Sequence, residues 1–243
     1  MASLYLIPQI DDQDAVPGGV VRVTGDEARH AISVARLRVG ERIAVGDGAG
    51  LIVEGSVAST DAGELTITVD VLRREERPNP ELWLAQALAK GDRDELAVQA
   101  ATELGVSGVI PWQAERSVSR WEGAKAAKGR DRWQSIVREA TKQAIRAWVP
   151  EVAAPATTAD LAALAGLVLV LEPTASSALT AVPIDGHDRI TLVVGPEGGV
   201  SPRERELLAG AGAHAVRLGP EVLRTSTAGP AALAVLNARL GRW

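Results

Sequence analysis

Residues Val193–Leu208 read VVGPEGGVSPRERELL, and this stretch decides the fold of the C-terminal half. It joins the apolar end of an expected strand to an expected helix through the sequence Gly-Pro-Glu-Gly-Gly at 195–199. A turn needs only one or two such residues, so the surplus of glycine predicts a backbone that closely approaches a ligand. Ser201-Pro202-Arg203-Glu204 forms a capping box, which places the start of the helix at Ser201.

Two common types of phosphate-binding loop are excluded for residues 195–199. It is not a Walker loop, because no Gly-Lys-Ser/Thr follows, and Pro196 and Glu197 do not fit the Rossmann glycine pattern. Its free N–H groups lie at the carboxyl end of a strand, where open α/β sheets bind their ligands. For this loop taken alone, a plain strand-to-helix turn is the alternative.

Two further strand ends weaken that alternative. The stretch VRLGPEVLRTSTAGPAAL, at 216–233, again ends a strand in Gly-Pro and offers the hydroxyls of residues 225–227. Gly229 and Pro230 are tolerated if the next helix starts near Thr227, because first-turn N–H groups lack partners anyway. A third strand ends in Leu171-Glu172-Pro173. We expect the three ends to wall one pocket.

Working outward, the pattern predicts two domains. Residues 81–243 alternate near-continuous apolar strands with helices, which is typical of the α/β class with a parallel sheet. Residues 1–74 hold short Val- and Ile-rich strands between Gly and Asp turns, interrupted by one expected helix at 26–37, and predict a small β-barrel. The charged segment with two prolines at 75–80 is the expected linker.

Composition bounds the class of protein. The 243 residues are 46% hydrophobic and 23% charged, which fits a globular protein with a substantial core. No apolar run approaches the roughly 20 residues of a membrane helix, and we expect no signal peptide. Cysteine is absent, which excludes disulfides and thiolate chemistry and fits a cytoplasmic protein. The three histidines lie far apart in the sequence, so we expect no metal.

The charge is unevenly distributed. A net charge of −5 argues against nucleic acid as a partner. The segment from Arg116 to Arg146, however, contains nine Lys or Arg residues and only three acidic ones. A second group of basic residues comprises Arg22, Arg29, Arg36, Arg38 and Arg42. We interpret both groups as phosphate contacts, with a solvated helix face as the alternative.

The paired C-terminal motifs resemble those of the RsmE family. VVGPEGGVSPRE and RLGPEVLRTSTA carry the resemblance, together with HAISVARLRVGERIAVGDG, ALAKGDRDELAVQAATELGVSGVIPWQAERSV and REATKQAIRAWVPEV. It extends over nearly the whole chain. It implies a PUA-like RNA-binding barrel at 1–74 and, at 81–243, a SPOUT methyltransferase domain with a C-terminal trefoil knot. The implied activity is methylation of N3 of a uridine in 16S ribosomal RNA by a homodimer that uses S-adenosylmethionine.

The resemblance also assigns roles to residues. Arg224 would stabilise charge on the uracil oxygens, with a salt bridge as its alternative role, and Glu197 would orient the cofactor or the base. The expected cofactor contacts are Leu171, Glu172, Pro173, Gly195, Pro196, Glu197, Gly198, Gly199, Leu218, Gly219, Leu223, Thr225, Ser226 and Thr227. The expected RNA contacts are Arg22, Arg29, Arg36, Arg38, Lys90, Arg93, Arg116 and Arg146.

The chain departs from the family pattern at a few positions. Glu221 and Ser226 replace the usual Arg and Glu, and Ala144-Ile145 replaces Ser-Gly. These departures leave open a non-catalytic RNA-binding or assembly factor on a methyltransferase scaffold. A nucleotide-binding enzyme with a small-molecule substrate is a second alternative, which would give the N-terminal barrel and the basic groups no role. Detectable methyl transfer to small-subunit RNA would exclude the first, and stabilisation by NAD or ATP alone would favour the second.

Overall fold

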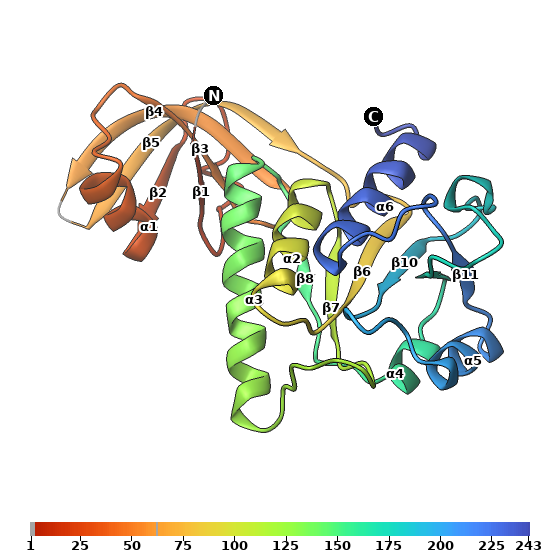
Figure 1. The fold of residues 1–243 in the computed structure, drawn as a ribbon. Helices are drawn as coiled ribbons and strands as arrows, with labels where there is room; N and C mark the ends of the chain where they lie inside the picture. The colour runs from red at the N-terminus through yellow and green to blue at the C-terminus, as the bar shows by residue number, and fades with distance from the viewer. Residues whose placement is uncertain (1–2, 62) are drawn as a thin grey trace. The chain divides into compact units, whose positions relative to one another are not determined.

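The computed structural model describes residues 3–61 and 63–243, so residues 1, 2 and 62 of the expected barrel lie outside the described residues. The chain forms two compact units (Figure 1). The first consists of Met1–Arg77 and Thr141–Val149, and the second of Pro78–Ala140 and Pro150–Trp243. The chain first passes from one unit to the other between Arg77 and Pro78, next to the residues expected to form the linker. The sequence pattern did not predict that residues 141–149 belong to the first unit.

The first unit is built on a five-stranded sheet in the order β1-β3-β4-β5-β2. Every strand contributes apolar side chains to one core, in which Val23, Val45 and Ile67 are fully buried. In β2 buried and exposed residues alternate, as expected for a strand with one face in the core. The bounds are β1 Leu4–Leu6, β2 Val20–Thr24, β3 Arg42–Gly46, β4 Leu51–Asp61 and β5 Glu64–Arg74.

The helix expected at 26–37 is shorter and irregular. It begins as the α-helix α1, Gly25–Arg29, and continues as a π-helical turn over His30–Val34. Ala28 and Ala31 are buried, so the wider turn keeps small side chains on the core. The segment ends at Arg36, whose φ of 56° lies in the left-handed region.

Residues 141–149 cover the other face of this sheet. Ile145, Trp148 and Val149 pack with the buried Ala147 against a cluster that includes Leu4 and Ile52. The indole N–H of Trp148 donates to the carbonyl of Glu75 at 2.9 Å. Ile145 has a φ of 51°, a conformation that favours glycine, at the position where the family pattern has Gly.

The second unit contains a six-stranded sheet in the order β11-β9-β10-β6-β7-β8, in which every pair of neighbours is parallel. This arrangement confirms the α/β class expected for residues 81–243. The bounds are β6 Glu81–Ala87, β7 Gly108–Trp112, β8 Glu151–Val152, β9 Leu167–Leu171, β10 Arg189–Val194 and β11 His214–Val216.

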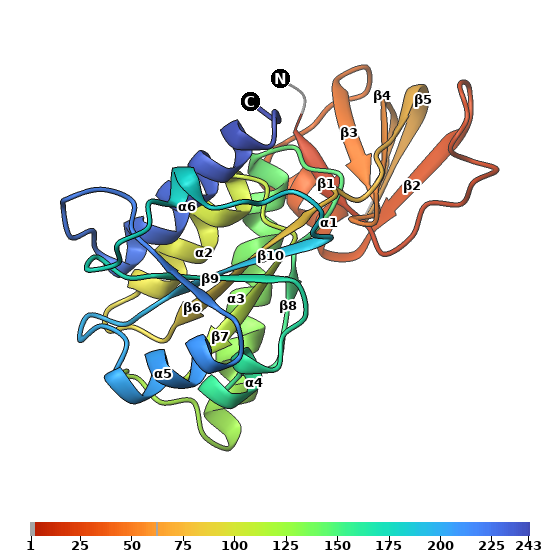
Figure 2. The same ribbon diagram turned by 90° about the vertical axis from the view of Figure 1, so that its right-hand side faces the viewer.

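Helices cover both faces of this sheet (Figure 2). On one face lie α2, Arg93–Glu103, and α6, Thr225–Arg239. On the other lie α4, Thr158–Ala162, and α5, Pro202–Gly210, whose Leu161 and Leu208 join the core of that face. The helix α3 spans Ala124–Gln143. A 3-10 turn occupies Leu179–Ala181.

The start of α6 differs from the expectation. The helix begins at Thr225, not near Thr227, so Pro230 lies inside it and provides no N–H for the carbonyl of Ser226. The presence of glycine at position 229 is explained by its packing and not by a place in the first turn of the helix. A Cβ there would lie 3.0 Å from Cδ1 of Leu84, so glycine lets α6 approach β6 closely. The trefoil knot that the resemblance implies stays a prediction.

Candidate functional site

The carboxyl ends of β9, β10 and β11 open into one cavity of about 660 Å³ in the second unit. The structure thus brings together the three strand ends that the sequence marked. The expected cofactor residues that line the cavity are Leu171, Glu172, Pro173, Gly195, Pro196, Glu197, Gly198, Gly199, Leu218, Gly219, Leu223 and Thr225, joined by the expected catalytic Arg224. Ser226 and Thr227, on the first turn of α6, are not part of the lining.

The glycine loop, Gly195–Gly199, is tightly built. A Cβ at Gly195 would lie 2.9 Å from Cγ2 of Val200, whereas a Cβ at Gly199 would have no atom within 4 Å. Gly199 has a φ of 71°, which glycine adopts without strain, and its N–H donates to the carbonyl of Pro196 at 2.8 Å. The second half of the loop therefore turns without a side chain on the cavity side.

The helix after this loop begins with the predicted capping box. The Glu204 N–H donates to Oγ of Ser201 at 3.2 Å, and the Ser201 N–H donates to the Glu204 carboxylate at 3.0 Å. The Glu204 carboxylate also accepts from the Glu115 N–H and the Thr158 hydroxyl, each at 2.8 Å. One buried carboxylate thus fixes the loop after β10 to the segment after β7.

Glu197 is held by the segment that follows β6. Its Oε1 accepts from the guanidinium of Arg93 at 3.0 Å and from the N–H of Lys90 at 3.3 Å. Burial by itself would raise the pKa of Glu197, but hydrogen bonds from its own N–H, Lys90 and Arg93, with the charge of Arg93, hold that pKa below its usual value. The carboxylate is therefore ionised in the neutral pH range.

Arg116 fixes the next residue of the loop. Its guanidinium donates to the carbonyl of Gly198 at 2.9 Å, and a Cβ at Gly198 would lie 3.2 Å from Cβ of Arg116. Two expected RNA contacts, Arg93 and Arg116, therefore also line the cavity beside the glycine loop.

The buried side-chain amide of Gln86 stabilises the cavity wall. The side chain of Gln86 is fully buried and its Nε2 donates to Oγ1 of Thr225 at 2.8 Å. The Thr225 hydroxyl in turn donates to the carbonyl of Gly195 at 2.9 Å. This chain of bonds ties β6, α6 and the glycine loop together. Gln86 was not predicted from the sequence, because an amide at the end of an apolar strand gives no local signal of its partner.

A second ion pair crosses the cavity wall at the end of β9. The Arg205 guanidinium on α5 donates to the Glu172 carboxylate at 3.1 Å, and the hydroxyl of Thr174 donates to the same carboxylate at 2.9 Å. Arg217 donates to the carbonyls of Ala175 and Ser176, each at 2.6 Å. Neither Arg205 nor Arg217 was predicted as a site residue. Arg205 stands in the charged stretch 203–206, and Arg217 directly follows a short strand, so neither position gives a local signal of its partner.

The segment from Leu218 to Arg224 is open by comparison. Val222 is 78% exposed, and Glu221 and Arg224 are exposed as well. In the part of the chain that the structure describes, Arg224 makes no side-chain hydrogen bond or ion pair, although it stands at the N-cap of α6. A cation without an internal acceptor at the rim of a cavity is available to a ligand.

The other expected RNA contacts lie in different settings. In the first unit, Arg22 pairs with Glu64 and Arg29 with Asp26, and both arginines, like Arg36 and Arg38, are largely exposed. Arg146 is half-buried, and burial lowers its pKa to about 10. Arg146 therefore presents less of its guanidinium to solvent than the others. That these bases form one continuous RNA-binding surface stays a prediction.

The cavity suits the expected cofactor on two grounds. Its volume falls within the roughly 300–1,000 Å³ of small-ligand sites, and its wall combines apolar side chains such as Leu171 with glycine backbone. That combination fits an adenosine bound by backbone hydrogen bonds. Within residues 3–61 and 63–243 no cluster of three or more His, Asp or Glu side chains could hold a metal ion. Over the same residues, no helix is both long and apolar enough to span a membrane.

A parallel α/β domain with a glycine-lined cavity at its carboxyl edge, preceded by a small β domain, defines a two-domain ligand-binding protein. The chain matches the family described as RNA methyltransferase domain over residues 75–237 and the RNA methyltransferase PUA domain over residues 23–70. It therefore belongs to the RNA methyltransferase family.

Individual relatives are similar over most of their length. The chain is 40% identical to ribosomal RNA small subunit methyltransferase E of Mycobacterium tuberculosis, over all of this chain and 94% of that protein. It is 31% identical to the Bacillus subtilis enzyme of the same name, over 88% of each chain.

Solved structures with bound cofactor are also similar. A methyltransferase of Legionella pneumophila in complex with SAM is 29% identical, with a TM-score of 0.87 over 98% of both chains. Ribosomal RNA small subunit methyltransferase E of Neisseria gonorrhoeae, bound to S-adenosyl methionine, is 27% identical, with a TM-score of 0.86 over 98% of both chains.

Proposed function

We propose that the protein methylates N3 of a uridine in the 16S RNA of the small ribosomal subunit, with S-adenosylmethionine as the methyl donor. The observation that carries this proposal is the single cavity formed by the three strand ends, with the glycine loop along one wall. Full-length relatives named as small-subunit ribosomal RNA methyltransferases, and similar structures that contain the cofactor, support it.

The cofactor supplies an electrophilic methyl group on a sulfonium, and the chain must bring the uracil to it. The backbone of the loops after β9, β10 and β11 would hold adenine, ribose and the methionine tail. The unpartnered guanidinium of Arg224 would donate hydrogen bonds to a uracil oxygen, where negative charge grows as N3 loses its proton. Glu197 is fixed beside the glycine loop, on the same cavity wall.

RNA would bind through the exposed arginines of the first unit and through Lys90, Arg93 and Arg116 near the cavity. Phosphate contacts supply salt-sensitive affinity but little sequence choice, so the target uridine is selected by base contacts and RNA shape. A protein that modifies ribosomal RNA would act in the cytoplasm.

The decisive experiment is mass mapping of methylated uridines in 16S RNA from cells with and without the gene. Loss of one N3-methyluridine in the deletion strain, and its return with purified protein and S-adenosylmethionine, is the expected result. Unchanged methylation in the deletion strain would favour a non-catalytic assembly role. Stabilisation by NAD or ATP, with S-adenosylmethionine without effect, would favour a small-molecule enzyme.

We further propose that the active form is a homodimer, as the family resemblance implies. The exposed apolar side chains of Val222 and Leu223, beside the cavity, and the Ala- and Leu-rich helix α6 are consistent with a partner subunit at this face. Light scattering at micromolar concentration should give twice the chain mass. A monomer with full activity would contradict this proposal.

A further inference from the structure

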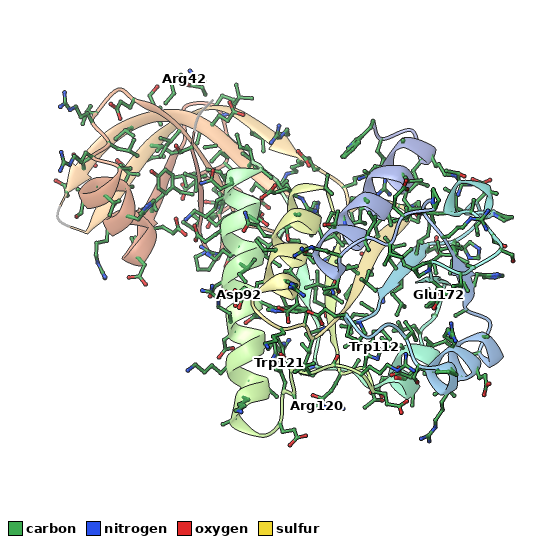
Figure 3. The ribbon with its side chains drawn as sticks, viewed as in Figure 1. Arg42, Asp92, Trp112, Arg120, Trp121 and Glu172 are labelled. Atoms are coloured by element: carbon green, nitrogen blue, oxygen red, sulfur yellow. The ribbon has the colours of Figure 1, made fainter. Side chains whose placement is uncertain are left out.

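The ion pair between Arg93 and Glu197 has an unusual position, and its interpretation rests on the proposed function. The two side chains come from α2 and from the glycine loop, and both line the cavity. The Arg93 side chain is 40% exposed and that of Glu197 is 31% exposed, so solvent and ligands can reach the pair. Asp92, just before Arg93, has a φ of 59° and starts α2 without a side-chain cap (Figure 3).

An exposed ion pair of this kind is weak, so another anion can compete for Arg93. A phosphodiester offers a guanidinium two oxygen acceptors in the same geometry as a carboxylate. Arg93 belongs to a local group of cations that also includes Lys90 and Arg116. Among the described residues, Arg93 is the one side chain that binds Glu197, which would keep the Lys90 N–H as a donor after Arg93 left.

We propose that Arg93 is a charge switch: a phosphate of the bound RNA takes Arg93 from Glu197, and the released carboxylate accepts the N3 proton of the target uracil. In the free enzyme Arg93 occupies the carboxylate. Only an RNA that reaches the cavity rim frees it, so the proton acceptor becomes available when the substrate is in place.

The step balances without a further reactant. The N3–H bond of uracil breaks and its proton moves to a Glu197 oxygen, leaving the electron pair on N3. That pair forms the new N3–C bond with the methyl carbon as the C–S bond breaks. The electrons of the C–S bond stay on sulfur, so the sulfonium becomes the neutral thioether of S-adenosylhomocysteine. Glu197 then releases the proton to water.

Several charged groups share the cavity with Glu197. Arg116 is engaged with the Gly198 carbonyl, and Arg205 with Glu172, while Arg217 donates to the backbone. The remaining charges of the lining are Arg224 and Glu221. Arg93 lowers the pKa of Glu197 through both a hydrogen bond and its positive charge. When Arg93 leaves, both contributions are lost and burial raises the pKa of Glu197 toward the range of a useful base.

The first test is Glu197→Gln, which keeps the shape and the hydrogen-bond acceptor but cannot take a proton. At saturating RNA, kcat should fall by about 10²–10⁴-fold, and the acid limb of the pH profile of kcat should disappear. Cofactor affinity by calorimetry should stay within about twofold, which shows that the site is folded. A variant with wild-type kcat and an unchanged acid limb would overturn the proposal.

The second test is Arg93→Ala, which distinguishes a switch from a fixed strut, that is, from an arginine that only holds the glycine loop in place. As a switch, Arg93 acts before chemistry, so KM for RNA should rise about tenfold while kcat at saturating RNA stays within about threefold. A ¹³C NMR titration of RNA-free Arg93→Ala should also show a Glu197 pKa above that of the wild type. Arg93→Lys should recover part of the RNA affinity. A fall in kcat equal to the rise in KM, or a changed cofactor affinity, would show a strut instead.

The matched control is Arg205→Ala, which breaks the other ion pair of the same cavity wall. It should alter cofactor affinity and leave KM for RNA unchanged; an equal rise in KM would mean that general loss of positive charge, not the switch, explains Arg93→Ala. All assays start from a wild-type protein with measured uridine methylation. Absence of that activity would contradict the proposed function, whereas wild-type activity with an unaffected Glu197→Gln variant would contradict the switch alone.

Discussion

Two loops of the second unit begin with the same tripeptide, Gly-Pro-Glu, and differ in almost every other respect. In the loop at 195–199, Glu197 binds Arg93 and Lys90, and Arg116 binds the next carbonyl. In the loop at 219–224, Glu221 is exposed and Arg224, among the residues that the structure describes, has no side-chain partner. Both loops line the same cavity.

The same tripeptide therefore occurs with two different sets of side-chain contacts. The first loop is followed by a capping box whose carboxylate also bonds to two other segments. The second enters α6 without a side-chain cap. A preorganised loop costs little to fill with a small ligand, whereas an open loop with a spare cation is suited to a partner that arrives later. This contrast leads us to propose that the first loop is the preformed part of the cofactor site, and that the second loop, through Arg224, adjusts when the nucleotide binds.

Apart from Glu197→Gln, replacement of Arg224 should give the largest effect of the tests on the two loops. If its guanidinium supports charge on the uracil oxygen, Arg224→Ala should lower kcat for RNA methylation by about 10²–10³-fold. Cofactor affinity, measured by calorimetry, should change little because the first loop is intact. A variant that loses cofactor binding and activity together would remove the distinction between the loops.

Gly199→Val should give a smaller effect, on the cofactor. A Cβ at Gly199 would meet no atom of the protein, so no clash unfolds the chain, but a β-branched residue is strained at a φ of 71°. Relief of that strain would shift the loop and place methyl groups on its cavity side. We expect S-adenosylmethionine to bind at least about tenfold more weakly, which corresponds to about 1.4 kcal/mol. Wild-type affinity by calorimetry would contradict a cofactor contact at this loop.

The first glycine of each loop offers a matched pair for stability. A Cβ at Gly195 would lie 2.9 Å from Cγ2 and 3.2 Å from N of Val200, both in packed structure. A Cβ at Gly219 would meet only a carboxylate oxygen of Glu221, at 3.3 Å. Gly195→Ala should therefore cost about 1–3 kcal/mol of unfolding free energy, and Gly219→Ala about 0.5 kcal/mol or less. Equal shifts in urea unfolding would mean that the two loops are equally constrained.

The smallest expected effect lies outside both loops. Arg29 and Arg36 are exposed in the first unit, and their joint replacement by Ala should weaken RNA binding without changing cofactor affinity. The slope of log K against log salt should flatten by about 0.7–0.9 per lost phosphate contact. Methylation at wild-type efficiency across a salt series would mean that this group of arginines does not bind RNA.

Much of the second unit follows from local sequence signals. The strands around 82–87 and 189–194 are nearly continuous apolar runs, and the capping box at Ser201 fixes a helix start because each of its bonds joins residues three apart. Short elements escaped prediction for the converse reason: β8 has two residues and α4 has five, too few for any periodicity.

The parts of the site that sequence could not supply depend on long-range contacts. Gln86 and Thr225 are 139 residues apart, and Arg93 and Glu197 are 104 apart, so neither pairing leaves a local pattern. The left-handed conformation of Ile145 is a similar case, because tertiary packing of its neighbours onto the first unit overrides the preference of a β-branched residue.

The same segment, Thr141–Val149, has a consequence for how the protein is made. The β domain ends near residue 77, yet Leu4, Leu6 and Ile52 on one face of its sheet pack against residues about 70 positions further along the chain. At a synthesis rate of roughly 5–20 residues per second, that face stays bare on the ribosome for roughly 4–14 seconds. During this interval the nascent chain exposes Leu4, Leu6 and Ile52 to whatever binds apolar surface, including chaperones. A fragment that stops at the linker would keep that exposure permanently.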